Sequence, residues 1–307
     1  MQLHEPSGRH AVGFALAGST MLLWSVLPHG LTLALAELDP VTITWFRFGV
    51  SAALMTAWLA LRGALPGLRD LAAARVLLFV ATAALAANYL TYLVGLDLTT
   101  PANAQVLIQM APLLLAVGGI VVFRERFTPG QWLAFGVLVG GILLFFASQL
   151  RELAAGFDRY LRGVAAIAVA AVTWAIYGLA QKQLLRSFTS QQVMTCIYVG
   201  CFVCFSVGAR PGELADLTAV GWGSLAFAAF NTLGAYGCFA AALAHWPASR
   251  VSAVLALTPL LTLAVGVAGS RWLPELVAPE HVSTTSLVGA ALVVTGSMGV
   301  SLAGRRG

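Results

Sequence analysis

The chain has 307 residues, of which 59% are hydrophobic and only 9% are charged, and its mean hydropathy is +0.87. A soluble domain has roughly 45–50% apolar and about 25% charged residues, so this composition excludes an ordinary water-soluble globule and indicates a membrane protein. The net charge of +5 does not indicate a nucleic-acid partner, because the 17 Lys and Arg residues lie mainly in short segments between apolar stretches and form no basic face.

Ten apolar stretches follow one another along the chain, and each has at least 19 residues, close to the length of about 20 that crosses a hydrocarbon layer. In chain order they are His10–Ala36, Pro40–Leu61, Val76–Leu96, Leu98–Phe123, Phe127–Leu150, Gly163–Gln181, Ser187–Ala209, Leu217–Ser249, Val251–Ser270 and His281–Gly304. Turn signals separate many of them: Asp39-Pro40, Thr100-Pro101, Pro129-Gly130, Pro211-Gly212 and Pro274. The sequence therefore predicts an all-α integral membrane protein with ten transmembrane helices.

The charges of the connecting segments predict the orientation of these helices. With the N-terminus in the cytoplasm, the inner segments carry eleven Lys or Arg residues and the outer segments carry five. An excess of basic residues is typical of the cytoplasmic side. We therefore expect a multi-pass protein of the bacterial cell inner membrane with both termini in the cytoplasm.

The two halves of the chain show a weak internal similarity at a nearly constant offset. Trp24 precedes Trp174 by 150 positions, and Tyr89 precedes Tyr236 by 147 positions. Further pairs are Tyr92 with Phe239, Ala-Pro-Leu-Leu at 111–114 with Thr-Pro-Leu-Leu at 258–261, and Gly136 with Gly289. These matches keep the same order along the chain, so they predict an internal repeat.

The repeat divides the chain into two domains, residues 11–150 and residues 160–304, with five predicted helices each. Because five is an odd number, the second domain begins on the opposite side of the membrane and is inverted relative to the first. Inverted repeats are a construction principle of secondary transporters, in which one half rocks against the other around a site near the middle of the membrane. The predicted fold is therefore two inverted five-helix repeats, and the predicted function is transport by alternating access.

Several motifs give the chain a resemblance to a known family. They are Trp24 in the first helix, Asp39-Pro40 before Trp45-Phe46-Arg47-Phe48, Ala104 with Pro112-Leu113, and Glu125-Arg126-Phe127-Thr128 followed by Gln131-Trp132-Leu133, Gly136 and Gly140-Gly141. With them the chain resembles, over about residues 11–304, the drug/metabolite transporter superfamily of the type built from two EamA five-helix repeats. Within that superfamily it is most similar to the bacterial aromatic amino-acid exporters.

This resemblance implies a secondary transporter that exports aromatic and other neutral amino acids across the inner membrane. Export of another small metabolite or drug is the alternative, and a membrane channel is a weaker one. The expected partners are a small-molecule substrate and membrane lipid, and the oligomeric state stays open.

Polar and aromatic side chains within the predicted spans are the candidate substrate-binding residues, because such groups tend to face the interior of a helix bundle. They are Trp24, His29, Asn88, Tyr89, Tyr92, Gln109, Trp174, Tyr177, Gln181, Asn231 and Tyr236. Aromatic rings with neutral hydrogen-bonding groups suit a zwitterion that has an aromatic or apolar side chain. The alternative is that the rings mark the membrane interfaces and the amides join helices.

Five residues within the spans have two possible roles each. Pro28, Pro112 and Pro259 are candidate hinges, with a static kink as the alternative. Arg47, the one charge within a span, either binds a substrate carboxylate or extends to the outer interface and pairs with Glu37 or Asp39. Arg47 follows Asp39-Pro40 by only one or two helical turns, which favours the role at the outer interface. For His29, a hydrogen-bonded packing role is favoured over proton sensing.

The chain contains no catalytic motif of the kinds that are read from sequence. It has no His-Glu-x-x-His helix, no Gly-x-Ser-x-Gly elbow and no Gly-Lys-Ser/Thr phosphate loop. Cys201 and Cys204 form a Cys-x-x-Cys pair, but they lie in an apolar stretch without a nearby His or acidic ligand, which favours packing. We therefore expect no enzymatic activity, no metal and no cofactor.

Overall fold

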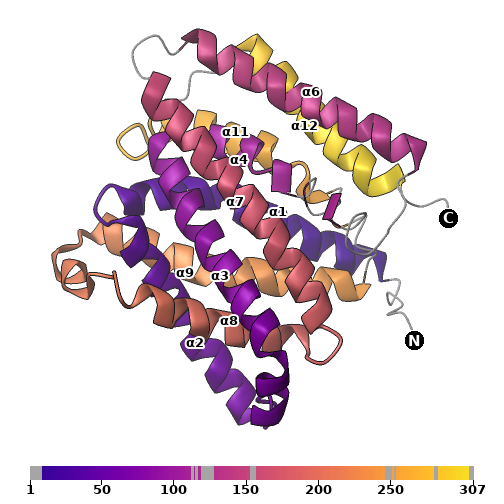
Figure 1. Cartoon of the computed structure of the whole chain (residues 1–307). Helices are drawn as coiled ribbons and strands as arrows, with labels where there is room; N and C mark the ends of the chain where they lie inside the picture. The colour runs from indigo at the N-terminus through magenta and orange to yellow at the C-terminus, as the bar shows by residue number, and fades with distance from the viewer. Residues whose placement is uncertain are drawn as a thin grey trace.

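The computed structural model describes residues 9–111, 114, 117–118, 128–152, 157–245, 251, 254–279 and 283–303. Within these ranges the chain forms helices and no strands (Figure 1). The labelled elements are α1 (His10–Leu35), α2 (Pro40–Leu61), α3 (Leu68–Leu98), α4 (Pro101–Leu107), α6 (Pro129–Glu152), α7 (Phe157–Leu184), α8 (Ser190–Phe205), the 3₁₀ turn η1 (Pro211–Asp216), α9 (Ala219–His245), α11 (Thr258–Trp272) and α12 (Thr284–Ala303).

Four of the described helices, α1, α2, α3 and α7, are long and apolar enough to cross a membrane. Shorter apolar stretches lie in α6, α8 and α12. The charge at Arg47 does not interrupt α2, which covers the predicted range Pro40–Leu61. In contrast, α3 begins at Leu68 rather than at Val76, because the charged residues that precede Val76 continue the helix. The number of ten spans stays a prediction.

Local sequence explains where several helices begin. The Asp39 carboxylate accepts two backbone N–H groups of the first turn of α2, and Pro40 occupies the first helical position, where no N–H is needed. The Thr100 hydroxyl caps α4 in the same way. Thr189 and Gln192 form a reciprocal capping box at the start of α8. An N-cap of this kind stabilises a helix by about 1 kcal/mol.

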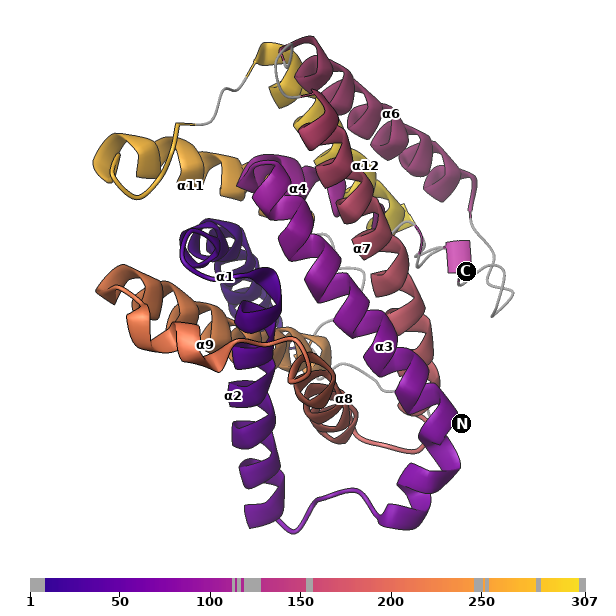
Figure 2. The ribbon, with the colours of Figure 1, turned by 60° about the vertical axis from the view of Figure 1, so that its left-hand side comes forward.

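The helices pack in pairs that join the first half of the chain to the second. Helix α1 packs against α9, α3 against α7, α2 against α8, α4 against α11 and α6 against α12. Figures 1 and 2 both show α3 running beside α7, and α6 beside α12 at one end of the molecule. Exchanging the predicted halves turns the α1–α9 pair into the α7–α3 pair and leaves the other three pairs unchanged. This pattern is what a two-fold relation between two five-helix halves produces.

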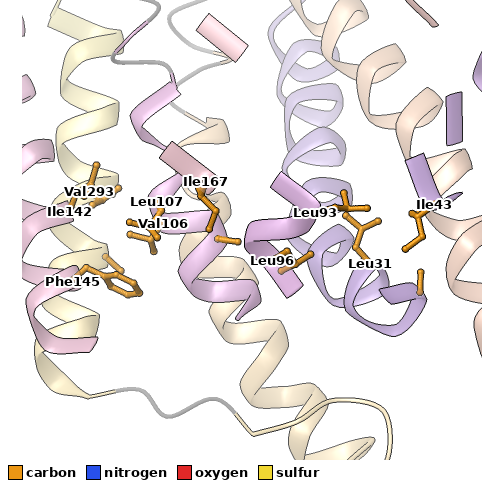
Figure 3. Packing of buried hydrophobic residues seen from close by; sticks show 14 of the residues in the cluster. Leu31, Ile43, Leu93, Leu96, Val106, Leu107, Ile142, Phe145, Ile167 and Val293 are labelled. Atoms are coloured by element: carbon orange, nitrogen blue, oxygen red, sulfur yellow. The ribbon is translucent and has the colours of Figure 1, made fainter. Parts of the chain in front are cut away.

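A buried apolar cluster extends across both halves. Figure 3 shows it passing from α6 and α12 through α4 and α7 to α3, α1 and α2. Close helix approach accompanies it where glycines meet: a Cβ added to Gly141 of α6 would lie 2.6 Å from the Val293 backbone nitrogen of α12. A Cβ on Gly289 of α12 would lie 2.7 Å from the Phe145 nitrogen of α6. Glycine is therefore required on both sides of this pair.

Candidate functional site

The single charge within α2 lies inside the bundle. The Arg47 side chain is buried, with a relative exposure of 2%. Its Nε and Nη2 atoms donate to the Thr232 hydroxyl oxygen of α9 at 3.2 and 3.1 Å. The Thr232 hydroxyl in turn donates to the Ala228 carbonyl at 2.9 Å, so its oxygen accepts from Arg47 without conflict. A charged side chain at the centre of a membrane helix costs roughly 2.5–3.5 kcal/mol, which makes this position costly unless it serves a purpose.

The expectation that Arg47 reaches the outer interface and pairs with Glu37 or Asp39 is wrong. Asp39 accepts the N-terminal amides of α2 and the Thr42 hydroxyl. Glu37 accepts the hydroxyl and the backbone N–H of Thr218, just before α9. Both carboxylates are thus engaged at the helix ends. Arg47 instead faces α9, because α2 packs on that helix about two turns further along.

Four tyrosine side chains lie within electrostatic range of the Arg47 guanidinium: Tyr89 and Tyr92 from α3, Tyr198 from α8 and Tyr236 from α9. The guanidinium carbon is 4.9 Å from the centre of the Tyr89 ring, a cation–π distance. These four tyrosines, Arg47 and Thr232 are called the Arg47 cluster below. It combines residues from both halves of the chain, and it holds the predicted site residues Tyr89, Tyr92 and Tyr236 together.

The predicted tryptophans and their neighbours extend this aromatic region. The Trp24 ring of α1 meets the Tyr236 ring edge-on at 5.6 Å between centroids. Trp174 of α7 packs against the apolar cluster that contains Tyr89 and Tyr177. The Tyr177 hydroxyl donates to the sulfur of a methionine of α8 at 3.1 Å. Aromatic groups from α1, α3, α7, α8 and α9 therefore converge between the two halves.

Three of the predicted polar residues bond to backbone carbonyls of neighbouring helices. Asn88 donates to the Ala170 carbonyl of α7 at 2.8 Å, and Asn231 donates to a carbonyl of α1 at 2.8 Å. The Nε2 atom of His29 lies 3.0 Å from the Thr262 carbonyl of α11. His29 is thus within hydrogen-bonding distance of a neighbouring helix, and its role in packing or in substrate binding stays a prediction. The amide carbonyl oxygen of Asn231 is buried and has no partner among the described residues, so only part of this side chain is used in joining helices.

The bond made by Asn88 between α3 and α7 has a counterpart between α1 and α9. Position 88 plus the offset of 147 gives Ala235, and position 170 minus the offset of 150 gives Thr20. The Thr20 hydroxyl lies 3.4 Å from the Ala235 carbonyl. The α1–α9 and α3–α7 contacts are therefore each bridged at the corresponding place by one side chain and one backbone carbonyl. The donor stands on α1 in one contact and on α3 in the other, and these two helices are not counterparts of each other.

Two helices are interrupted at equivalent places. Helix α4 ends at Leu107, a turn occupies residues 108–109, and helical structure resumes at Met110. A turn at residues 256–257 likewise precedes α11. The predicted site residue Gln109 lies in the turn at residues 108–109. Broken helices at membrane depth leave backbone groups free to contact a ligand and are a recurring element of transporter sites.

The predicted hinge prolines differ in their positions. Pro28 is buried within the continuous helix α1. Pro259 stands in the first turn of α11, directly after the interruption, where a proline needs no hydrogen-bond acceptor. Pro112 lies outside the described residues. A role of these prolines as hinges stays a prediction.

The Arg47 cluster is packed shut in this structure. Thr232, Tyr198 and Arg47 are at most 2% exposed.

A groove of about 430 Å³ lies elsewhere, between α11 and α12, with apolar lining except for Arg271, and it shares no residue with the cluster. Cys201 is buried and Cys204 is exposed, so the two thiols of the Cys-x-x-Cys pair point to different environments.

Comparison with known proteins assigns the family. The chain matches the EamA-like transporter family twice, over residues 11–147 and 161–302. It belongs to this family. The EamA chain is 34% identical to the inner membrane transporter YhbE of Escherichia coli (strain K12), over 94% of this chain and 90% of that protein. It is 31% identical to a transporter of Haemophilus influenzae, over 94% of both chains.

A solved crystal structure shares the fold, with a TM-score of 0.60 at 21% sequence identity, and the match covers 96% of this chain and 98% of that chain. This EamA protein is accordingly a multi-pass bacterial inner-membrane transporter with a small-molecule substrate and a lipid environment. Tyr198 of the Arg47 cluster was not predicted from the sequence. Thr232 directly follows the predicted Asn231 and is one of the polar residues within the same predicted span.

Proposed function

We propose that this EamA protein exports aromatic and other neutral amino acids across the inner membrane by alternating access, with both termini in the cytoplasm. The observation that carries the proposal is the Arg47 cluster, in which aromatic and neutral polar groups from both halves converge at their junction. A site at this junction changes its access when one half moves against the other.

The helix pairing supports the mechanism. Every main contact in the described bundle joins the first half to the second, so a rotation of one half changes all of these contacts together. The interruptions before Met110 and Thr258 leave non-helical backbone next to α4 and α11, which pack against each other. The shut cluster then corresponds to an occluded arrangement between two open ones.

The chemistry of the junction supports the cargo. The rings of Trp24, Tyr89 and Tyr236 offer stacking and edge contacts for an apolar or aromatic side chain. The single cation suits a cargo with one negative group, whereas phosphorylated or multiply anionic cargo calls for several Arg or Lys residues. A neutral amino acid, with one carboxylate and one ammonium, meets both conditions.

The test is transport by the purified full-length protein in proteoliposomes. We expect saturable uptake of labelled phenylalanine, with competition by unlabelled tyrosine and tryptophan and weak competition by glutamate or lysine. Liposomes without protein provide the baseline. Linear, unsaturable flux would indicate a channel, and absence of flux for every amino acid tested would refute the proposed cargo.

A further inference from the structure

Arg47 is a buried cation without a charge partner in the described part of the chain. Two ion pairs are formed by described residues, Arg159 with Asp97 and Arg210 with Glu213, and both lie at exposed helix ends. No Asp or Glu lies within α2. A guanidinium inside a membrane-spanning bundle favours a nearby anion, because the low dielectric strengthens the attraction between opposite charges.

The guanidinium also retains unused donors. Arg carries five N–H groups in a planar fork, and the hydrogen bonds within the described residues come from Nε and Nη2 and end on one oxygen, that of Thr232. Nη1 donates to no acceptor in the same part of the chain. Thr232 thus holds the guanidinium by one edge and leaves the remaining donors for another group.

A second unpartnered group lies one turn along the same helix. Ser51 follows Arg47 by four positions, so the two side chains lie on one face of α2. The Ser51 side chain is fully buried, and its hydroxyl has no hydrogen-bond partner among the described residues. Buried polar groups are ordinarily hydrogen-bonded, so an unused hydroxyl one helical turn from an unused guanidinium edge points to a ligand with acceptor oxygens.

We infer that Arg47, held by Thr232, binds the carboxylate of the transported molecule. The inference rests on the proposed function for its choice of cargo, and it adds the group by which cargo is recognised. A carboxylate presents two acceptor oxygens, which match the fork of a guanidinium in a charge-assisted pair. The Tyr89 ring then covers one face of the guanidinium, and the neighbouring rings receive the side chain of the cargo.

The first experiment measures binding to the purified full-length protein, by isothermal titration, of two matched pairs of ligands. The pairs are L-phenylalanine with L-phenylalaninamide, and 3-phenylpropionate with 3-phenylpropionamide. Each amide keeps the shape of its acid and loses the negative charge. We expect each acid to bind at least about tenfold more tightly than its amide, because a charge-assisted pair is lost. Equal affinity within both pairs, or no binding of either acid, would overturn the inference.

The second experiment assigns the preference to this residue. We expect Arg47→Gln to remove the difference between acid and amide. Arg62→Gln is the matched control: Arg62 follows the end of the same helix, where it lies 4.5 Å from the Trp58 ring, and this change should leave the difference intact. Should Arg47→Gln not fold, Thr232→Val and Thr232→Ser decide. The valine variant removes the hydroxyl that positions Arg47 and should weaken binding of the acids, whereas serine keeps it.

Retention of the full acid preference in Arg47→Gln, or in Thr232→Val where the glutamine variant does not fold, would overturn the inference. The outcome is separable from that of the proposed function. Phenylalanine flux without a preference for acids would leave the exporter in place and refute the role of Arg47. A preference for 3-phenylpropionate that depends on Arg47, without flux of any amino acid, would support the role of Arg47 and refute the export of amino acids.

Discussion

The α6–α12 pair and the Arg47 cluster differ in what fills the space between helices from the two halves. In the α6–α12 pair, glycines let backbone meet backbone, as at Gly141 and Gly289. In the Arg47 cluster, a guanidinium, four tyrosines and a threonine hydroxyl occupy the contact. Backbone contact allows no other molecule between the helices, whereas long polar and aromatic side chains can change rotamer and make room for one. On the proposed function, the first region is scaffold and the second is the place where cargo binds.

The largest effect is expected at the scaffold. Gly141→Ala places a methyl group 2.6 Å from the Val293 nitrogen and 2.9 Å from the Gly289 carbonyl, so α6 and α12 must separate. We expect a loss of about 1–3 kcal/mol in stability, as for other overpacked positions. Thermal unfolding of the detergent-solubilised protein measures it. Gly140→Ala is the neighbouring control, because a Cβ at Gly140 meets nothing within 4 Å, and equal loss in both variants would contradict the role of close approach.

A smaller free-energy change, with a larger effect on transport than on folding, is expected in the aromatic region. Trp174→Ala and Tyr92→Ala remove half-buried rings near the junction. We expect kcat/KM for phenylalanine to fall at least about tenfold, which corresponds to about 1.4 kcal/mol, while the amount of folded protein is preserved. Flux assays normalised to folded protein provide the measurement. Wild-type rates in both variants would show that these rings only pack.

A substitution at Asn88 distinguishes between its two possible roles, which are substrate binding and the joining of helices. Its amide donates to the Ala170 carbonyl between α3 and α7. Hydrogen bonds between membrane helices contribute on average about 0.6 kcal/mol, so Asn88→Ala should lower the melting temperature slightly and leave KM unchanged. A several-fold rise in KM without a change in melting temperature would instead assign Asn88 to the cargo site.

The smallest effect is expected at the helix ends, where Glu37 joins the α1–α2 connection to the start of α9. Hydrogen bonds from the Thr218 hydroxyl and backbone N–H lower the pKa of Glu37 below its ordinary value of about 4.5. A lowered pKa means that the folded state binds this proton less readily than the unfolded state. The contact therefore stabilises fully above about pH 4.5, and its contribution is lost as the pH falls through the lowered pKa. Glu37→Gln should flatten this part of the stability profile, and identical profiles would contradict the assignment.

The sequence predicted the helices well where local chemistry sets their ends. Asp39 and Pro40 begin α2, Thr100 begins α4, and Pro129 begins α6, each as the turn signals indicate. The start of α3 was missed, because charges were treated as the end of a span, although a helix can extend beyond the apolar layer as far as Leu68. Capping and turn residues determine where a helix begins or ends, whereas the thickness of the apolar layer does not.

The site was predicted in part, for a related reason. Tyr89 and Tyr236 were predicted because they are amphipathic side chains within apolar stretches. The direction of Arg47 was not found, because it depends on the packing of α2 against α9. Its partner Thr232 stands 185 positions away, and no spacing rule connects the two. Contacts between the halves are decided by tertiary packing, which a single sequence does not encode locally.

On the proposed function, the junction between the halves is an alternating-access site for neutral amino acids. Counterflow in proteoliposomes tests this function, because the binding site of a carrier must reorient across the membrane after each transport step, whereas a channel has no such step. Proteoliposomes loaded with unlabelled phenylalanine should accumulate labelled phenylalanine transiently and faster than empty ones. Entry of label at the same rate with and without internal phenylalanine would refute exchange of phenylalanine by an alternating-access carrier.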